Sequence, residues 1–161
     1  MSGEFKNLIR VGRVSSVNPA AATARVVFEA QGVVSYDLPV LQRQTLRNQD
    51  YCLPDVGEHV LCIFLPTGNA EGFILGSFYS DQDQPPAGAD SENKRIVRFE
   101  DGTTVEYDRA TSTFTINAVG PVNIVAAEVL QISAPKGVTI SATDQQGSGV
   151  QINGKDTSGS W

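Results

Sequence analysis

The chain has 161 residues and a formal net charge of −6, with 12 Lys and Arg against 18 Asp and Glu. This acidic balance argues against a nucleic-acid-binding surface, and no apolar run is long enough to span a bilayer as a helix. Two cysteines are too few for a disulfide scaffold, while 15 Gly and 8 Pro favour turn-rich β structure over helix. The length allows one compact domain plus an extension.

Residues 1–80 predict a small all-β domain, because short apolar strand segments alternate with turn signals such as Asn18-Pro19 and Gln31-Gly32. Five strands with the longest gap after the third are typical of a Greek-key barrel of the OB-fold type. We expect a short helix over 42–49 in that gap. The predicted strands cover 8–17, 23–29, 33–41, 58–65 and 72–79.

This region offers no catalytic or metal-binding constellation. His59 follows Glu58, but no serine or cysteine nucleophile is indicated nearby, so we interpret His59 as a surface residue on a strand. Cys52 and Cys62 lack metal-site spacing, and Cys62 lies in an apolar run that predicts a buried free thiol. We therefore expect a protein that is not an enzyme, with no catalytic residues, no metal and no cofactor.

Residues 81–95 predict a linker, because the stretch from Ser80 to Ser91 has no large apolar residue. Its carboxylates are expected to be solvated and not to form a site; they are Asp81, Asp83, Asp90 and Glu92.

A β-hairpin follows around Asp101-Gly102. A two-residue turn would place Phe99 opposite Thr104 and Val97 opposite Glu106. A three-residue loop, Asp101 to Thr103, places Phe99 opposite Val105 and Val97 opposite Tyr107. We prefer the second register because it pairs apolar with apolar side chains and Arg98 with Glu106.

Four eight-residue units then run without a gap over 114–143. In each unit the first position is large and apolar, the third is Ile and the fifth is Ala, with mostly polar residues between them. This is the two-residue period of half-buried strands, repeated as an architecture. The positions expected to face the core are Phe114, Ile116, Ala118, Val122, Ile124, Ala126, Leu130, Ile132, Ala134, Val138, Ile140 and Ala142.

One chain supplies too little apolar surface per unit to enclose a core, and its strands also need hydrogen-bond partners. Three chains wound about one axis would satisfy both needs, with the Ile and Ala columns forming layers of a narrow prism. An antiparallel meander with equally spaced turns is the alternative. The hairpin and repeat, 96–143, thus predict the shaft of an intertwined trimeric β-helix.

The tail, 144–161, contains Val150-Gln-Ile152, which repeats the Val-x-Ile pattern four residues late. We expect Val150 and Ile152 either to form one more apolar layer at the tip or to lie in a short strand. Trp161 is expected to be a free end.

The order of these motifs resembles baseplate assembly protein V, the central spike of contractile phage tails such as that of Mu, which is related to the VgrG spikes of type VI secretion. The resemblance covers nearly all of residues 5–143. It rests on Val56-Gly-Glu-His-Val-Leu61, Gly72-Phe-Ile-Leu-Gly-Ser-Phe-Tyr79, the Pro-containing linker, Arg98-Phe-Glu-Asp-Gly-Thr-Thr-Val-Glu-Tyr107 and the repeat.

This resemblance implies an OB-fold collar over 1–80, a homotrimeric shaft and a role in piercing the outer envelope of the target cell. It also implies a location in the virion baseplate after assembly in the host cytoplasm, with the tail hub protein as partner. Many members bind iron at the apex through a His-x-His pair. The single histidine here, His59, lies in the predicted barrel, so that metal site does not carry over. We expect a metal-free apex or a blunt end that receives a separate tip protein.

Two other functions fit parts of the sequence. An OB-fold protein that binds nucleic acid would need a basic stripe with stacking aromatics, whereas residues 1–80 carry a net charge of about −1. The five arginines of this region would serve equally to dock an acidic surface of the hub; they are Arg10, Arg13, Arg25, Arg43 and Arg47. A trimeric tail-fibre β-helix would share the shaft but not the collar.

Overall fold

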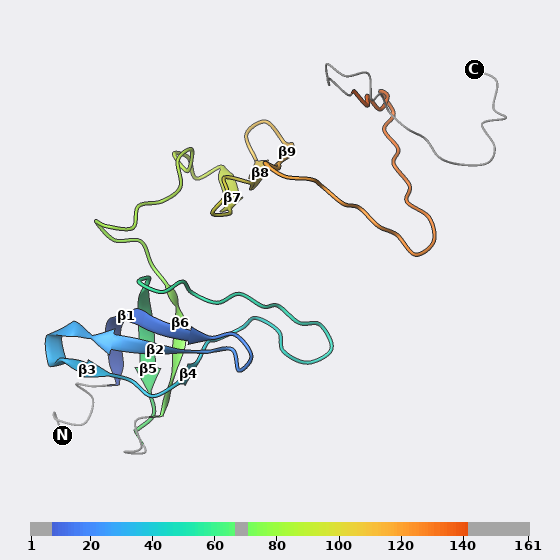
Figure 1. The fold of residues 1–161 in the computed structure, drawn as a ribbon. Coiled ribbons are helices and arrows are strands. Elements are labelled where there is room, and N and C mark those ends of the chain that lie inside the picture. Colours follow the sequence, from blue (N-terminus) through green and yellow to red (C-terminus); the bar gives the residue numbers. More distant parts are fainter. Residues whose placement is uncertain (1–7, 67–70, 142–161) are drawn as a thin grey trace. The chain divides into compact units, whose positions relative to one another are not determined.

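The computed structural model describes residues 8–66 and 71–141 (Figure 1). Within these residues the secondary structure is β-strand, apart from one 3-10 turn at Glu29–Gln31. The chain divides into two units, Met1–Asn117 and Ala118–Trp161, and each is described by itself. The predicted all-β class is confirmed.

The first unit begins with a sheet of six strands, called the N-terminal sheet. Its strand order is β3-β2-β1-β5-β6, and β4 also pairs with β2. The pairs of named strands are antiparallel, and sequence neighbours generally lie side by side. The strands are β1 (Ile9–Asn18), β2 (Thr23–Phe28), β3 (Val33–Val34), β4 (Leu38–Pro39), β5 (His59–Phe64) and β6 (Gly72–Ser77).

The pairing path of this sheet returns on itself. After β4 has paired with β2, Val40 forms a parallel bridge with Ile74 of β6, and the Leu41 N–H donates to the Ile74 carbonyl oxygen at 2.9 Å. Since β6 pairs with β5, β5 with β1 and β1 with β2, no gap is left in this circuit.

The predicted strand over 33–41 is two short strands in the structure. Ser35 lies at the break between them. Its N–H donates to the Val26 carbonyl oxygen at 2.9 Å, and its hydroxyl accepts the Val26 N–H at 2.9 Å. The Ser35 side chain thus takes the place of a ladder hydrogen bond, which allows the chain to turn between β3 and β4.

The core of the N-terminal sheet lies on the inner face of the circuit. Its residues are the alternate apolar positions of the strands, as the two-residue period predicts. Cys62 is fully buried among them, and this burial raises the pKa of its thiol to about 11. The rings of Phe28 and Phe64 meet edge to face at 5.7 Å. The buried residues are Val14, Ala24, Val26, Phe28, Leu38, Val60, Cys62, Phe64 and Ile74.

Gly12 of β1 allows the strands to approach closely across this core. A Cβ at position 12 would lie 2.5 Å from Val26 Cγ1 and 2.6 Å from the Val27 carbonyl oxygen. Any larger residue would therefore have to displace backbone as well as side chain.

The predicted helix over 42–49 is wrong. The Gln42 side chain bonds both backbone groups of Cys52, accepting its N–H at 3.0 Å and donating to its carbonyl at 2.9 Å. Thr45 bridges to Gln49 within the closed loop. Leu46 is the only large apolar residue of 42–49, so a helix there would have no apolar face to pack.

A separate three-stranded sheet follows, called the hairpin sheet, with order β7-β8-β9. Its strands are β7 (Lys94–Arg98), β8 (Thr104–Asp108) and β9 (Thr113–Asn117).

The hairpin was predicted correctly, but its preferred register was wrong by two residues: Val97 was expected opposite Tyr107. Val97 faces Val105, and the Phe99 N–H donates to the Thr103 carbonyl oxygen at 2.9 Å. The loop therefore spans Glu100 to Gly102, and Gly102 occupies its last position with a φ of 91°. A three-residue hairpin loop requires a left-handed conformation at its last residue, which glycine adopts most easily. The position of Gly102 therefore set the register, and the pairing of side chains across the strands did not.

Candidate assembly interface

One face of the hairpin sheet carries six apolar side chains that no other part of the described chain covers, together with Arg95, which lies opposite Tyr107. The register brings Val97, Val105 and Ile116 into one row across the three strands, and Tyr107 faces Phe114 in the next row. We call this surface the hairpin-sheet face. It consists of Val97, Phe99, Val105, Tyr107, Phe114 and Ile116, all of them exposed or half-buried.

The opposite face of the hairpin sheet is mostly polar. Lys94 pairs there with Glu106 at 3.9 Å and with Asp90 at 3.5 Å. The β9 residues on this side are Thr113, Thr115 and Asn117. The sheet is thus a single layer with a solvent side and an apolar side, the arrangement of a sheet that packs one face against something else.

The first unit of the repeat belongs to this sheet. Phe114 and Ile116 lie on β9 and point to the hairpin-sheet face, while Ala118 follows directly and is half-buried. Sequence reasoning identified these three residues but did not join them to Val97 and Val105. The sequence could have shown this link, because alternate residues of two paired strands lie on one face, and the strand of Phe114 and Ile116 directly follows the hairpin.

The remaining described units of the repeat, over 118–141, form no strand in the single chain. Their large apolar residues are exposed, Ile124 by 67% and Ile132 by 64%. Ala126 and Ala134 are exposed as well. The other exposed residues of the pattern are Val122, Leu130, Val138 and Ile140. Ala142, Val150 and Ile152 lie outside the described residues.

This exposure has a large free-energy consequence. Burying one Val, Leu, Ile or Phe side chain contributes about 1.5–3 kcal/mol, and the eight large residues of the pattern are each between 50% and 67% exposed. Large exposed apolar side chains in such number are typical of segments that pack against a partner. The arrangement can therefore associate with matching strands.

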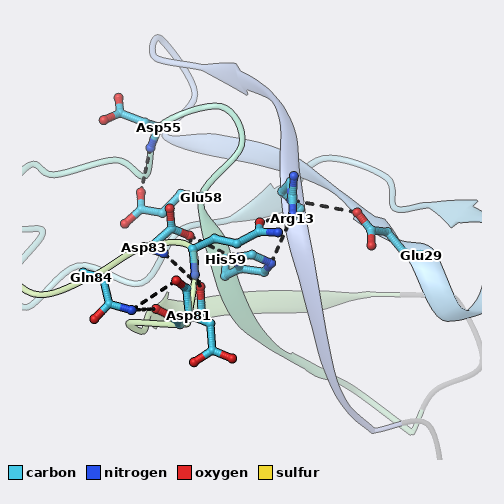
Figure 2. Close-up of polar contacts among 10 residues, drawn as sticks. Arg13, Glu29, Asp55, Glu58, His59, Asp81, Asp83 and Gln84 are labelled. Carbon is cyan, nitrogen blue, oxygen red and sulfur yellow. Dashed lines mark hydrogen bonds and ion pairs between the residues drawn. The ribbon is translucent and has the colours of Figure 1, made fainter.

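A cluster of polar side chains on the N-terminal sheet binds the first residues of the linker. Figure 2 shows His59 of β5 between Arg13 of β1 and Asp83. His59 Nδ1 lies 2.9 Å from Asp83 Oδ2, and Arg13 Nη2 donates to Gln82 Oε1 at 3.0 Å. The residues around Ser80 form a tight turn, in which the Ser80 N–H donates to the Asp83 carbonyl oxygen at 2.9 Å.

The linker carboxylates Asp81 and Asp83 are exposed, as expected, and Asp83 in addition contacts His59 of the sheet. His59 is partly buried, with 21% of its side chain exposed. The cluster lacks the geometry of a catalytic triad, because His59 Nε2 faces Arg13 Nη2 at 3.5 Å and the Ser80 hydroxyl points to Asp83 instead.

The arginines of the N-terminal sheet are mostly engaged within the chain. Arg25 Nε donates to Asp37 Oδ1 at 2.9 Å, and this contact raises the pKa of Arg25 and lowers that of Asp37. Arg43 pairs with Asp50 at 3.0 Å, and the Arg10 guanidinium lies over the rings of Phe28 and Phe64. These contacts do not form the basic stripe that a nucleic-acid surface needs, so that alternative is not favoured.

Among residues 8–66 and 71–141, His, Cys, Asp and Glu side chains form no cluster of three that could hold a metal ion. In the same residues, no helix has the length and apolarity to cross a membrane.

Comparison with known proteins adds an independent observation. No family model matches the chain. The chain is 28% identical over 132 residues to the spike protein of Escherichia phage P2, a match that covers 81% of this chain. It spans 60% of the length of that relative. The order of motifs from the N-terminal sheet to the repeat agrees with this similarity to a phage spike protein.

Proposed function

We propose that this protein is a homotrimeric, non-enzymatic central spike of a contractile tail baseplate, which pierces the envelope of the target cell. The observation that carries the proposal is the uncovered apolar pattern of the hairpin sheet and repeat, in a chain similar to a phage spike protein. In this proposal residues 1–80 are the collar, 81–95 the linker, 96–143 the shaft and 144–161 the tip.

The N-terminal sheet would be the collar, with an OB-type barrel. The pairing circuit supports this barrel. Strands β3 and β4 pair with β2 of the β1-β2 hairpin, and the residue after β4 forms a parallel bridge with β6. Strand β5 lies between β6 and β1 and completes the circuit. A five-stranded Greek-key barrel has this connectivity. The collar would attach the shaft to the tail hub protein.

The hairpin sheet and repeat would form the shaft as an intertwined trimeric β-helix. Three chains around one axis bring each unit against the same unit of its neighbours, so the Ile and Ala columns become layers of a dry core. Interchain hydrogen bonds would satisfy the backbone groups of 118–141 and carry the axial load. Such a shaft performs its function by stiffness and shape, and needs no catalytic group or cofactor.

At its far end the shaft would either close on a metal-free layer of Val150 and Ile152 or receive a separate tip protein. Either end is compatible with insertion into an envelope, and the protein would lie in the virion after assembly in the host cytoplasm.

The test is the mass of the full-length protein in solution, measured by sedimentation equilibrium over a hundredfold concentration range. We expect a single species of three times the 17.2 kDa of one chain, with no dissociation at micromolar concentration. A monomer, or a dimer that explains all the data, would overturn the proposal.

A further inference from the structure

A second apolar surface lies on the outside of the N-terminal sheet. Along β1, β5 and β6 the residues that alternate with the buried core point outward, and six of them are apolar. The register places Ile9 opposite Ile63, Val11 opposite Leu61 and Ile63 opposite Phe73. We call this surface the outer strand face; it consists of Ile9, Val11, Leu61, Ile63, Phe73 and Leu75.

In the part of the chain that the structure describes, the outer strand face is partly open to solvent. Val11 is 55% exposed, and Leu61 and Ile63 are half-buried. Val11, Leu61 and Leu75 line a shallow hollow of about 440 Å³ together with Phe78. The apolar part of this side covers the pairs from Ile9 and Ile63 to Val11 and Leu61 and ends at Arg13 and His59, whereas the outer face of an antiparallel sheet that meets water is normally polar throughout.

The polypeptide that leads to the shaft starts from this same face. Phe78, directly after β6, lines the hollow. The next pair along β1 and β5 is Arg13 opposite His59. The Arg13 side chain donates a hydrogen bond to Gln82, and His59 contacts Asp83. In a trimer the three linkers converge on one shaft, so the surface from which they start is where the copies approach one another.

The chemistry of the face also favours another copy of this chain over the tail hub. A surface of aliphatic and aromatic groups without charge is complementary to itself, and permanent interfaces between identical chains are the most apolar class. A partner that joins later would be selected by charged and polar groups, which this face lacks.

We infer that the outer strand face is a second trimer contact, which packs against the neighbouring collars of the same trimer. This inference rests on the proposed trimeric spike and deepens it, because it places an interface within the collar that is independent of the repeat. The contacts among Arg13, His59 and Asp83 then hold the start of each linker at the edge of that interface.

The inference is tested by cysteine accessibility in the full-length trimer. Cys52 is exposed and is first changed to Ser, whereas Cys62 is buried and its raised pKa, about 11, keeps it unreactive in the folded protein. Val11→Cys is then compared with a matched variant, Leu46→Cys, whose position is 83% exposed on a loop outside the face. The measured quantity is the rate of N-ethylmaleimide labelling, followed by mass spectrometry.

We expect position 11 to react at least about tenfold more slowly than position 46 in the trimer. The protection should disappear when Ile124→Asp is added to dissociate the trimer, which shows that it comes from assembly and not from the single chain. Equal labelling rates at the two positions in a protein that sediments as a trimer would overturn this inference and leave the spike proposal standing. Sedimentation as a monomer would instead overturn both.

Discussion

The N-terminal sheet and the repeat use the same sequence pattern to opposite effect. Both contain short segments in which every second residue is apolar. In the N-terminal sheet the apolar positions are buried within one chain, as Leu38 and Ile74 show with at most 1% exposure. In the repeat, Ile124 and Ile132 stay mostly exposed. Alternation therefore specifies that a face must be covered, but not by which chain.

The physical difference between the two regions lies in their connections. The strands of the N-terminal sheet are joined by turns and by one long loop, so that the chain can fold back and close a circuit over its own core. The units of the repeat are joined by only three residues each and follow one another along the chain. In the proposed shaft their apolar residues would form a column, which parallel copies of the same chain would cover most simply.

The largest effect that tests this comparison is expected in the repeat. Ile124→Asp would place three carboxylates in one apolar layer, where charged groups have no partner. We expect trimer association to weaken by at least about 4 kcal/mol, a thousandfold in the equilibrium constant, while the N-terminal sheet stays folded. Sedimentation equilibrium gives the association, and circular dichroism gives the fold.

The matched control for that change is Ser133→Asp, at a polar position next to Ile132 in the same strand pattern. It introduces the same charge on the solvent side and should leave the trimer intact. If both variants dissociate equally, charge and not layer burial explains the effect, and the proposed core is wrong.

A smaller effect is expected within the N-terminal sheet. Gly12→Ala adds a Cβ that would lie 2.5 Å from Val26 Cγ1, so we expect the free energy of unfolding of the collar to fall by about 1–3 kcal/mol. The trimer should persist at low temperature, because the repeat is unchanged. Thermal unfolding followed by scanning calorimetry measures the effect.

Gly120→Ala is the control for this substitution, because no atom lies within 4 Å of a Cβ built at position 120. It should leave the unfolding transition of the collar unchanged. Equal destabilisation by the two variants would show that the close contact between position 12 and Val26 does not cause the loss of stability.

The smallest effect is expected at the exposed pair of Arg25 and Asp37. Since the contact lowers the pKa of Asp37 in the folded state, its stabilisation is present above the unfolded pKa near 3.8 and is lost as the pH falls below that value. We expect Asp37→Asn to lower the melting temperature of the collar slightly at pH 6 and not at all at pH 2.5.

A double-mutant cycle with Arg25→Gln checks the assignment. The double variant should be no less stable than either single variant at pH 6, because both remove the same contact. Additive losses would show that Asp37 and Arg25 act separately.

Much of the fold was accessible from the sequence. The five strand segments of the N-terminal region were predicted to within a few residues, with one of them divided at Ser35 in the structure. The buried thiol of Cys62 was predicted from its apolar run. These features depend on local period and composition, which a sequence displays directly.

The errors occurred where a particular hydrogen bond or backbone conformation decided the outcome. The helix over 42–49 was excluded by the bonds between Gln42 and Cys52, which lie ten residues apart in sequence. The hairpin register followed the positive φ of Gly102 and not the pairing of Arg98 with Glu106. The attachment of Asp83 to His59 could not be read from a stretch that has the composition of a linker.

By itself, the sequence determined the β class, the alternating apolar positions of the strands and the eight-residue repeat. These follow from side-chain period, which is a property of neighbours along the chain. Only the tertiary structure decided which strands pair, because that depends on contacts between residues far apart in sequence. It thereby joined Val97 and Val105 to Ile116 on the hairpin-sheet face, and Ile9 and Val11 to the outer strand face.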